Sequence, residues 1–135
     1  MKIRPSVQAV IFDENKRKFL LIKQFDKRKK RYLWRLVKGG IEKNETEEQA
    51  VKREIQEEVG LKKIEIVGKI YEYEYIFPPR KFIVFIYLVK ADMEEKVVLE
   101  FTEEDKIKDF VWVSKDQAIE MLYWKDEKQS IKLSK

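Results

Sequence analysis

The 135-residue sequence contains no cysteine and no histidine. Without cysteine there is no disulfide and no thiol nucleophile. Without histidine there is no histidine-based catalytic triad and no imidazole ligand for a metal ion. Carboxylates are therefore the only strong ligands that this chain offers to a hard metal ion.

Long apolar runs are also absent. None approaches the ~18 residues of a membrane span, and Met1–Pro5 do not lead into the apolar core of a signal peptide. We therefore expect a cytoplasmic protein with no membrane partner. An apolar content of 44% argues against disorder, and 135 residues are enough for a core. A single domain over residues 1–135, without linker or repeat, is expected.

Charge of both signs is abundant. Charged residues make up 41% of the chain, and the formal net charge is +5. The dominance of Lys and Glu is typical of hyperthermophile proteins and predicts a thermophilic source. The basic excess suits a polyanionic substrate. The densest cationic run, Lys27–Arg31, is interpreted either as a solvated loop or as a segment that steers phosphate groups.

The most informative pattern is the spacing of acidic residues between Gly39 and Leu61. With an advance of about 100° per helical residue, Glu54, Glu57 and Glu58 share roughly a 100° arc. Like charges at such spacings destabilise a helix unless a cation lies between them. Mg²⁺ prefers a few carboxylates together with substrate phosphate oxygens. The pattern therefore predicts a divalent-metal site, against the alternative of a solvated, Glu-rich amphipathic helix.

The same residues carry a resemblance to a known family. The pattern G-x5-E-x7-R-E-I-x-E-E-x-G-L matches the signature of the Nudix hydrolases through Gly39, Glu45, Arg53, Glu54, Ile55, Glu57, Glu58, Gly60 and Leu61. The resemblance implies hydrolysis of a pyrophosphate bond with Mg²⁺ or Mn²⁺. The substrate that it implies is usually a nucleoside diphosphate linked to another moiety.

The resemblance also implies roles for these residues. Glu57 and Glu58 are the main metal ligands, and Glu54 shares that role. Arg53 and Glu45 are expected to form a bidentate pair that orients the carboxylates, the alternative being a solvated arginine. The predicted catalytic set is Glu57, Glu58, Glu54, Arg53, Glu45, Glu104 and Glu103.

The catalytic base lies on the helix in some Nudix enzymes and on a distal loop in others. Glu103 and Glu104 are the distal candidates and Glu100 a less favoured one, and each has the alternative of a solvated loop glutamate. Gly39 and Gly40 are expected to give a backbone carbonyl to the metal. Adjacent glycines also permit backbone conformations forbidden to other residues, and close approach to a ligand.

Substrate choice is predicted from residues outside the signature. Trp34–Gly39 resembles the W-x-x-P-K-G segment of the diadenosine tetraphosphate hydrolase branch, with Val37 in place of proline. Arg4, Lys38 and Lys81 are interpreted as phosphate contacts or plain surface. Tyr75 or Phe77 either stacks on a base or belongs to the core. The predicted substrate contacts are Lys38, Gly39, Gly40, Trp34, Arg4, Tyr75 and Phe77.

A dinucleoside tetraphosphate, cleaved to ATP and AMP, is thus the first expectation. ADP-ribose or a nucleotide sugar is an alternative, to which Pro78-Pro79 points, and a nucleoside triphosphate is another. An RNA 5′ end is less favoured because no long basic groove element is evident, although the net charge supports it. A non-catalytic nucleotide sensor conflicts with the intact carboxylates. The sequence does not indicate an oligomeric state.

The order of expected elements indicates an α+β fold, a Nudix-type sandwich of a mixed β-sheet between α-helices. Thr46 and Gln49 form a capping box for a helix that Gly60 ends, with Val51, Ile55 and Val59 buried. Strands are expected over residues 7–12, 18–25, 32–37, 64–77, 81–89 and 110–113, with two further helices after Ser114 and within 126–135.

Overall fold

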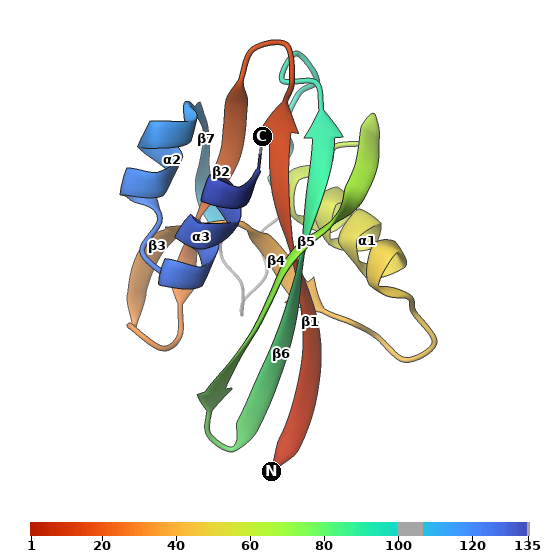
Figure 1. The fold of residues 1–135 in the computed structure, drawn as a ribbon, viewed down its shortest axis with the longest axis vertical. Helices are drawn as coiled ribbons and strands as arrows, with labels where there is room; N and C mark the ends of the chain where they lie inside the picture. The colour runs from red at the N-terminus through yellow and green to blue at the C-terminus, as the bar shows by residue number, and fades with distance from the viewer. Residues whose placement is uncertain (100–106, 135) are drawn as a thin grey trace.

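The computed structural model describes residues 1–99 and 107–134. In chain order its elements are β1 (Lys2–Asp13), β2 (Lys18–Asp26), β3 (Arg31–Arg35), β4 (Val37–Gly40), α1 (Glu47–Val59), β5 (Ile64–Phe77), β6 (Arg80–Ala91), β7 (Ile107–Val113), α2 (Lys115–Met121) and α3 (Lys125–Leu133). Figure 1 shows α1 on one side of the sheet and α2 with α3 on the other. The predicted α+β sandwich is confirmed. None of the helices in the described ranges is long and apolar enough to cross a membrane.

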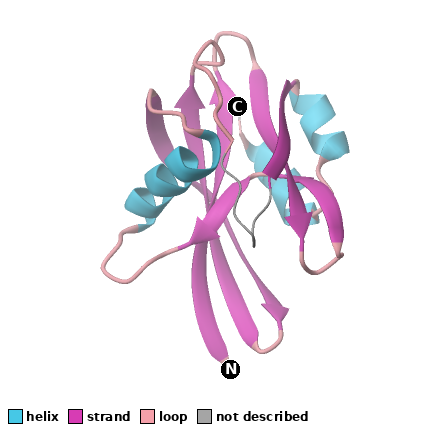
Figure 2. Ribbon diagram, turned by 180° about the vertical axis from the view of Figure 1, so that it is seen from behind, coloured by secondary structure: helices cyan, strands magenta, loops and turns pink. Residues whose placement is uncertain are grey.

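The sheet opens because β1 and β2 separate soon after their hairpin turn. Only Phe12–Phe19 and Asp13–Lys18 pair between them. Beyond these pairs, β1 runs parallel to β6 and antiparallel to β4, whereas β2 pairs with β3 and β7. Pairing with β6 extends β1 back to Lys2, so the predicted start at residue 7 is too late. The far ends of β1, β5 and β6 project beyond the helices (Figure 2).

Alternate residues of β1 divide the core into two parts. Val7, Ala9 and Ile11 pack with the α1 stripe, and Val10 and Phe12 pack with the C-terminal helices. The stripe predicted for α1 is confirmed, because Val51, Ile55 and Val59 are each at most 1% exposed. β6 lies between β1 and β5, as its two apolar faces indicate.

Local signals set the ends of α1 as predicted. The Thr46 side chain accepts a hydrogen bond from the Gln49 backbone, and the Gln49 side chain accepts one from the Thr46 backbone. At the other end, Gly60 has a φ of 70° and its N–H donates to the carbonyls of Gln56 and Ile55. Ser114 caps α2 with a second capping box, so that predicted cap is also confirmed.

The strand predicted over residues 32–37 is instead two strands. β3 pairs with β2 and β4 pairs with β1, and the buried Leu36 lies between them. The change of partner at Leu36 moves the chain from one branch of the opened sheet to the other. β7 likewise begins at Ile107 rather than residue 110, because it pairs with β2 as far as Gln24.

Candidate active site

The carboxylates of α1 face the glycines of β4. A Cβ built on Gly39 would lie 1.8 Å from Glu54 Oε2, so only glycine leaves room for this carboxylate. Among the described glycines, Gly60 alone has a positive φ. Gly39 and Gly40 therefore do not use the left-handed conformations that glycine permits. The small size of Gly39 allows a close approach, here to Glu54.

Arg53 connects the elements around these glycines. Its Nε and Nη2 donate to Glu45 Oε2 and Oε1 at 2.6 and 3.0 Å, so the predicted bidentate geometry is confirmed. Nη2 also donates to the Gly40 carbonyl at 2.8 Å. Nη1 donates to Glu54 and Glu57 at 3.0 and 2.9 Å. One guanidinium thus joins the loop before α1, β4 and two of the candidate ligands.

The pKa values of Glu45 and Glu54 are shifted in opposite directions. Hydrogen bonds from Arg53 lower the pKa of Glu45 to about 2, so this carboxylate is ionised at neutral pH. Burial raises the pKa of Glu54 to about 7, even though the charge of Arg53 opposes the rise. The Glu54 side chain is only 12% exposed. A carboxylate that is costly to ionise in the free protein is one whose charge a bound cation would stabilise.

The three candidate ligands do not converge on one point. Glu54 and Glu57 turn to Arg53, and Glu58 accepts a hydrogen bond from the Lys38 N–H at 3.3 Å. No three acidic side chains within residues 1–99 and 107–134 are gathered as a ready metal site. The donor chemistry nevertheless fits Mg²⁺ or Mn²⁺, because α1 and β4 offer carboxylate and backbone carbonyl oxygens, and Glu54 and Glu58 lie against Gly39 and Lys38 of β4. A bound ion would take the place of the present partners of these carboxylates.

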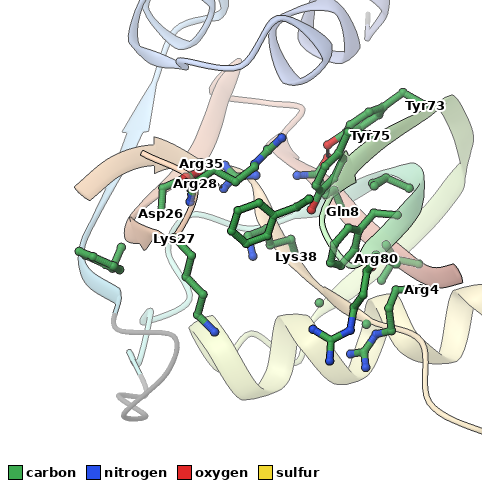
Figure 3. A pocket seen from close by; sticks show the side chains of 18 residues that line it. Arg4, Gln8, Asp26, Lys27, Arg28, Arg35, Lys38, Tyr73, Tyr75 and Arg80 are labelled. Carbon is green, nitrogen blue, oxygen red and sulfur yellow. Dashed lines mark hydrogen bonds and ion pairs between the residues drawn. The ribbon is translucent and has the colours of Figure 1, made fainter. Parts of the chain in front are cut away.

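A cavity of about 390 Å³ opens beside the glycines and is lined by residues of β1 to β6 and of the β2–β3 loop. Its cationic lining residues are Arg4, Lys27, Arg28, Arg35, Lys38 and Arg80. In Figure 3 the side chains of Arg4, Lys27 and Arg80 point towards α1. Asp26 is the acidic residue among the lining residues. The cavity therefore offers positive charge to an anion that reaches the α1 carboxylates.

An aromatic wall closes the β5–β6 side of the cavity. Tyr75 and Phe82 stack with ring centroids 4.7 Å apart and an interplanar angle of 9°, and Tyr73 lies 6.1 Å from Tyr75. Phe77 also lines the cavity. These residues share a face because Tyr73, Tyr75 and Phe77 alternate along β5 and pair with β6 residues of the same face. Stacked rings at a cavity wall suit a planar base.

Most predicted substrate residues meet at this cavity, and two do not. Arg4, Lys38, Gly39, Gly40, Tyr75 and Phe77 line it. Trp34 is not among the lining residues, since it packs on the core beside α2 and α3 with Lys23 5.7 Å from its ring centroid. Lys81 is also absent and pairs with Glu74 at 2.9 Å. Glu100, Glu103 and Glu104 lie outside the described residues.

Two cationic lining residues, Arg80 and Arg35, were not singled out from the sequence, and Lys27 and Arg28 were predicted only as part of the Lys27–Arg31 run. Arg80, rather than Lys81, reaches the cavity because it shares a strand face with Phe82, and the period of two could have indicated this. Arg35 is held by Asp26 and Glu127 at 2.8 and 2.6 Å. Arg28 belongs to the Lys27–Arg31 run, and no local signal distinguishes it from its neighbours. Its position depends on aromatic residues far away in the chain.

Two named proteins are similar to this chain over most of its length. The RNA pyrophosphohydrolase of a Nitratiruptor species is 30% identical over 125 residues, which cover 83% of this chain and 78% of that protein. The RNA pyrophosphohydrolase of a Sulfurovum species is 31% identical over 130 residues, covering 87% and 81%.

Solved structures share the fold at lower identity. An Ap4A hydrolase binary complex from C. elegans superposes with a TM-score of 0.80 at 20% identity, covering 96% of this chain and 93% of that one. The MutT protein from Methanosarcina mazei Go1 gives 0.79 at 21% identity, covering 97% and 91%. The NUDIX domain family itself matches residues 2–133. This chain therefore belongs to the NUDIX domain family and is a Nudix pyrophosphohydrolase.

Proposed function

We propose that this enzyme hydrolyses the 5′-polyphosphate of a nucleotide with the help of Mg²⁺ or Mn²⁺, and that its preferred substrate is the 5′-triphosphate end of an RNA. The observation that carries the proposal is the cavity, which is lined by six cationic side chains and an aromatic wall, with three of the cations pointing towards α1. The names of the relatives at 30% and 31% identity support RNA as the substrate.

The chain's own residues would bind the phosphates, hold the base and hold the metal. Arg4, Lys27 and Arg80 point towards α1 and would bind the non-reacting phosphates, which holds the scissile bond against the helix. Tyr75 would stack on the first base, which would replace the Arg28 guanidinium that lies 4.0 Å from the ring centroid. Glu54, Glu57 and Glu58 would hold the metal. When bound, the metal stabilises developing phosphate charge and lowers the pKa of a water molecule.

Arg53 and Glu45 act on the metal ligands rather than on the substrate. Their two hydrogen bonds fix the guanidinium that also contacts Glu54 and Glu57. Release of these carboxylates to a cation would leave Arg53 attached to Glu45 and the Gly40 carbonyl. The helix carboxylates and the distal Glu103 and Glu104 remain the candidates for the general base.

A dinucleoside tetraphosphate is the second candidate. The Trp34–Gly39 resemblance and the aromatic wall favour it, and a fold neighbour is an Ap4A hydrolase. It ranks below RNA because Trp34 is not among the residues that line the cavity. ADP-ribose and free nucleoside triphosphates are the remaining substrates to compare.

A substrate panel with product analysis tests the proposal. We expect the highest kcat/KM for a 5′-triphosphate RNA, followed by diadenosine tetraphosphate, ADP-ribose and ATP. Glu57→Gln and Glu58→Gln should each lower kcat by at least ~10²-fold, because metal charge stabilisation is worth several kcal/mol. Glu48→Gln, on an exposed position of the same helix, is the matched control. A tenfold preference for any other substrate would overturn the RNA assignment.

A further inference from the structure

Cationic and aromatic side chains alternate on the surface next to the cavity. Lys29 Nζ lies 5.4 Å and the Arg31 guanidinium 5.3 Å from the centroid of the Tyr123 ring. Lys108 Nζ lies 4.2 Å from the centroid of Tyr32. These residues come from the β2–β3 loop, β3, β7 and the segment between α2 and α3. The fold therefore gathers them from places far apart in the sequence.

Arg28 joins this surface to the cavity. Its guanidinium lies 4.0 Å from the ring centroid of Tyr75 on the cavity wall and 3.7 Å from that of Trp124. Figure 3 shows Arg28 beside Tyr75 and Arg35. The surface formed by Lys29, Arg31, Tyr32, Lys108, Tyr123 and Trp124, called here the loop surface, is thus continuous with the substrate cavity through Arg28.

The β2–β3 loop, which carries Arg28 and Lys29, is held in place by Asp26. Asp26 Oδ1 accepts hydrogen bonds from the N–H groups of Arg28 and Lys29, both at 2.9 Å. Asp26 Oδ2 accepts from Trp124 Nε1 at 2.9 Å and from Arg35 Nη1 at 2.8 Å. The Asp26 carboxylate is therefore buried and used by four donors. Its charge is directed inward rather than towards an approaching anion.

The outer members of the loop surface are accessible and have cations over rings in place of acidic partners. Lys29, Arg31 and Lys108 are exposed, and Tyr123 is 40% exposed. Within the described part of the chain, none of these three cations forms an ion pair with a carboxylate. Exposed cations interleaved with aromatic rings bind single-stranded nucleic acid through its phosphates and its stacked bases.

We propose that the loop surface binds the nucleotides of an RNA chain that follow the 5′ end seated in the cavity. The inference rests on the proposed function, because it gives that substrate a path from the catalytic cavity. A free nucleoside triphosphate would fill the cavity and leave the loop surface empty. The phosphates of the next nucleotides would meet Lys29, Arg31 and Lys108, and a base would stack on Tyr123.

Dependence on RNA length tests this proposal. We would measure kcat/KM for 5′-triphosphate substrates from one to about eight nucleotides, a length within the site sizes of single-strand binders. The variant Lys29→Gln/Arg31→Gln/Tyr123→Ala is compared with Lys62→Gln/Lys63→Gln, which removes two exposed lysines at the approach to β5. We expect kcat/KM of the wild type to rise at least about tenfold with length, and the loop variant to lose that gain.

Binding of a 5′-hydroxyl oligonucleotide separates the loop surface from catalysis. Fluorescence anisotropy should show binding that weakens between ~50 and ~200 mM salt and falls about tenfold in the loop variant. A length-independent kcat/KM with equal binding by wild type and variant would overturn the loop surface but leave the proposed function intact. Variant-sensitive binding without hydrolysis of any triphosphate RNA would support the surface and overturn the function.

Two further measurements address a destabilised variant and a competing class of partner. If the triple variant has a lowered melting temperature, Tyr123→Ala alone removes the stacking ring without changing charge, and it should still reduce the length gain. Poly-glutamate tests the competing class of partner, an acidic protein. Equal affinity of poly-glutamate and the oligonucleotide, with no effect of Tyr123→Ala on either, would overturn the RNA assignment.

Discussion

The Glu54 carboxylate occupies the space that a side chain on residue 39 would need. A Cβ on Gly39 would lie 1.8 Å from Glu54 Oε2, far inside van der Waals contact. This relationship ties β4, whose backbone borders the cavity, to the helix that carries the candidate metal ligands. Substitution at residue 39 is thus a way to move Glu54 without altering its chemistry.

Gly39→Ala should displace Glu54 and weaken metal binding. We expect the Mg²⁺ concentration for half-maximal activity to rise about 10–100-fold, as when a metal ligand loses its orientation. Overpacking should also cost about 1–3 kcal/mol of unfolding free energy. Gly68→Ala is the matched control, because a Cβ at residue 68 would meet no atom within 4 Å and the φ of Gly68 is not positive. Unchanged metal dependence in Gly39→Ala would exclude Glu54 as a ligand.

Arg53→Lys should keep the charge but lose the geometry. An ammonium cannot reproduce two parallel hydrogen bonds to Glu45 together with those to Gly40 and the helix carboxylates. We expect kcat/KM to fall about 10–100-fold with a raised Mg²⁺ requirement. Lys52→Arg, on the exposed neighbouring position, controls for the charge. If only the melting temperature falls and the Mg²⁺ requirement stays constant, Arg53 is a structural residue alone.

Divalent metal should stabilise the folded protein. A ligand that binds only the native state, at ten times its Kd, adds about 1.4 kcal/mol to the unfolding free energy. Differential scanning calorimetry with millimolar Mg²⁺ or Mn²⁺, against NaCl of equal ionic strength, measures the gain. The variant with Glu54, Glu57 and Glu58 all changed to Gln should lose it. The same gain in that variant would place the metal elsewhere.

The features that could be predicted from the sequence are those set by residues close to one another in the chain. The ends of α1 were predicted because Thr46, Gln49 and Gly60 act on backbone groups within one turn. The Arg53–Glu45 pair was predicted because both residues have fixed places in the signature. Metal and base roles remain predictions, because the contacts of these carboxylates with Arg53 and Lys38 do not decide them.

The remaining features depend on contacts between distant segments. The separation of β1 from β2 follows from the pairing of β1 with β6, whose paired residues lie 78 positions further along the chain, as Lys2–Arg80 and Phe12–Lys90 show. The place of Arg28 depends on Tyr75 and Trp124, neither of which is a sequence neighbour. Trp34 resembled a family motif, yet the pairing of β3 with β2 takes it away from the cavity lining.

Two residues of the cavity lining are held by Glu127, which lies on α3 and is fully buried. Its carboxylate accepts hydrogen bonds from Arg35 Nε at 2.7 Å, Gln8 Nε2 at 2.8 Å and the Leu36 N–H at 3.2 Å. Arg35 and Gln8 both line the cavity, so α3 fixes the floor of a site to which it contributes no lining residue.

Glu127→Gln should therefore destabilise the protein strongly. The amide keeps the volume of the side chain but removes the charge that compensates Arg35, which is only 4% exposed. Breaking a buried ion pair on one side costs about 3–5 kcal/mol, and urea denaturation measures this loss directly. Glu120→Gln, at an exposed position of α2, should change the unfolding free energy by less than about 0.5 kcal/mol. A loss below about 1 kcal/mol in Glu127→Gln would show that Asp26 alone compensates the buried guanidinium.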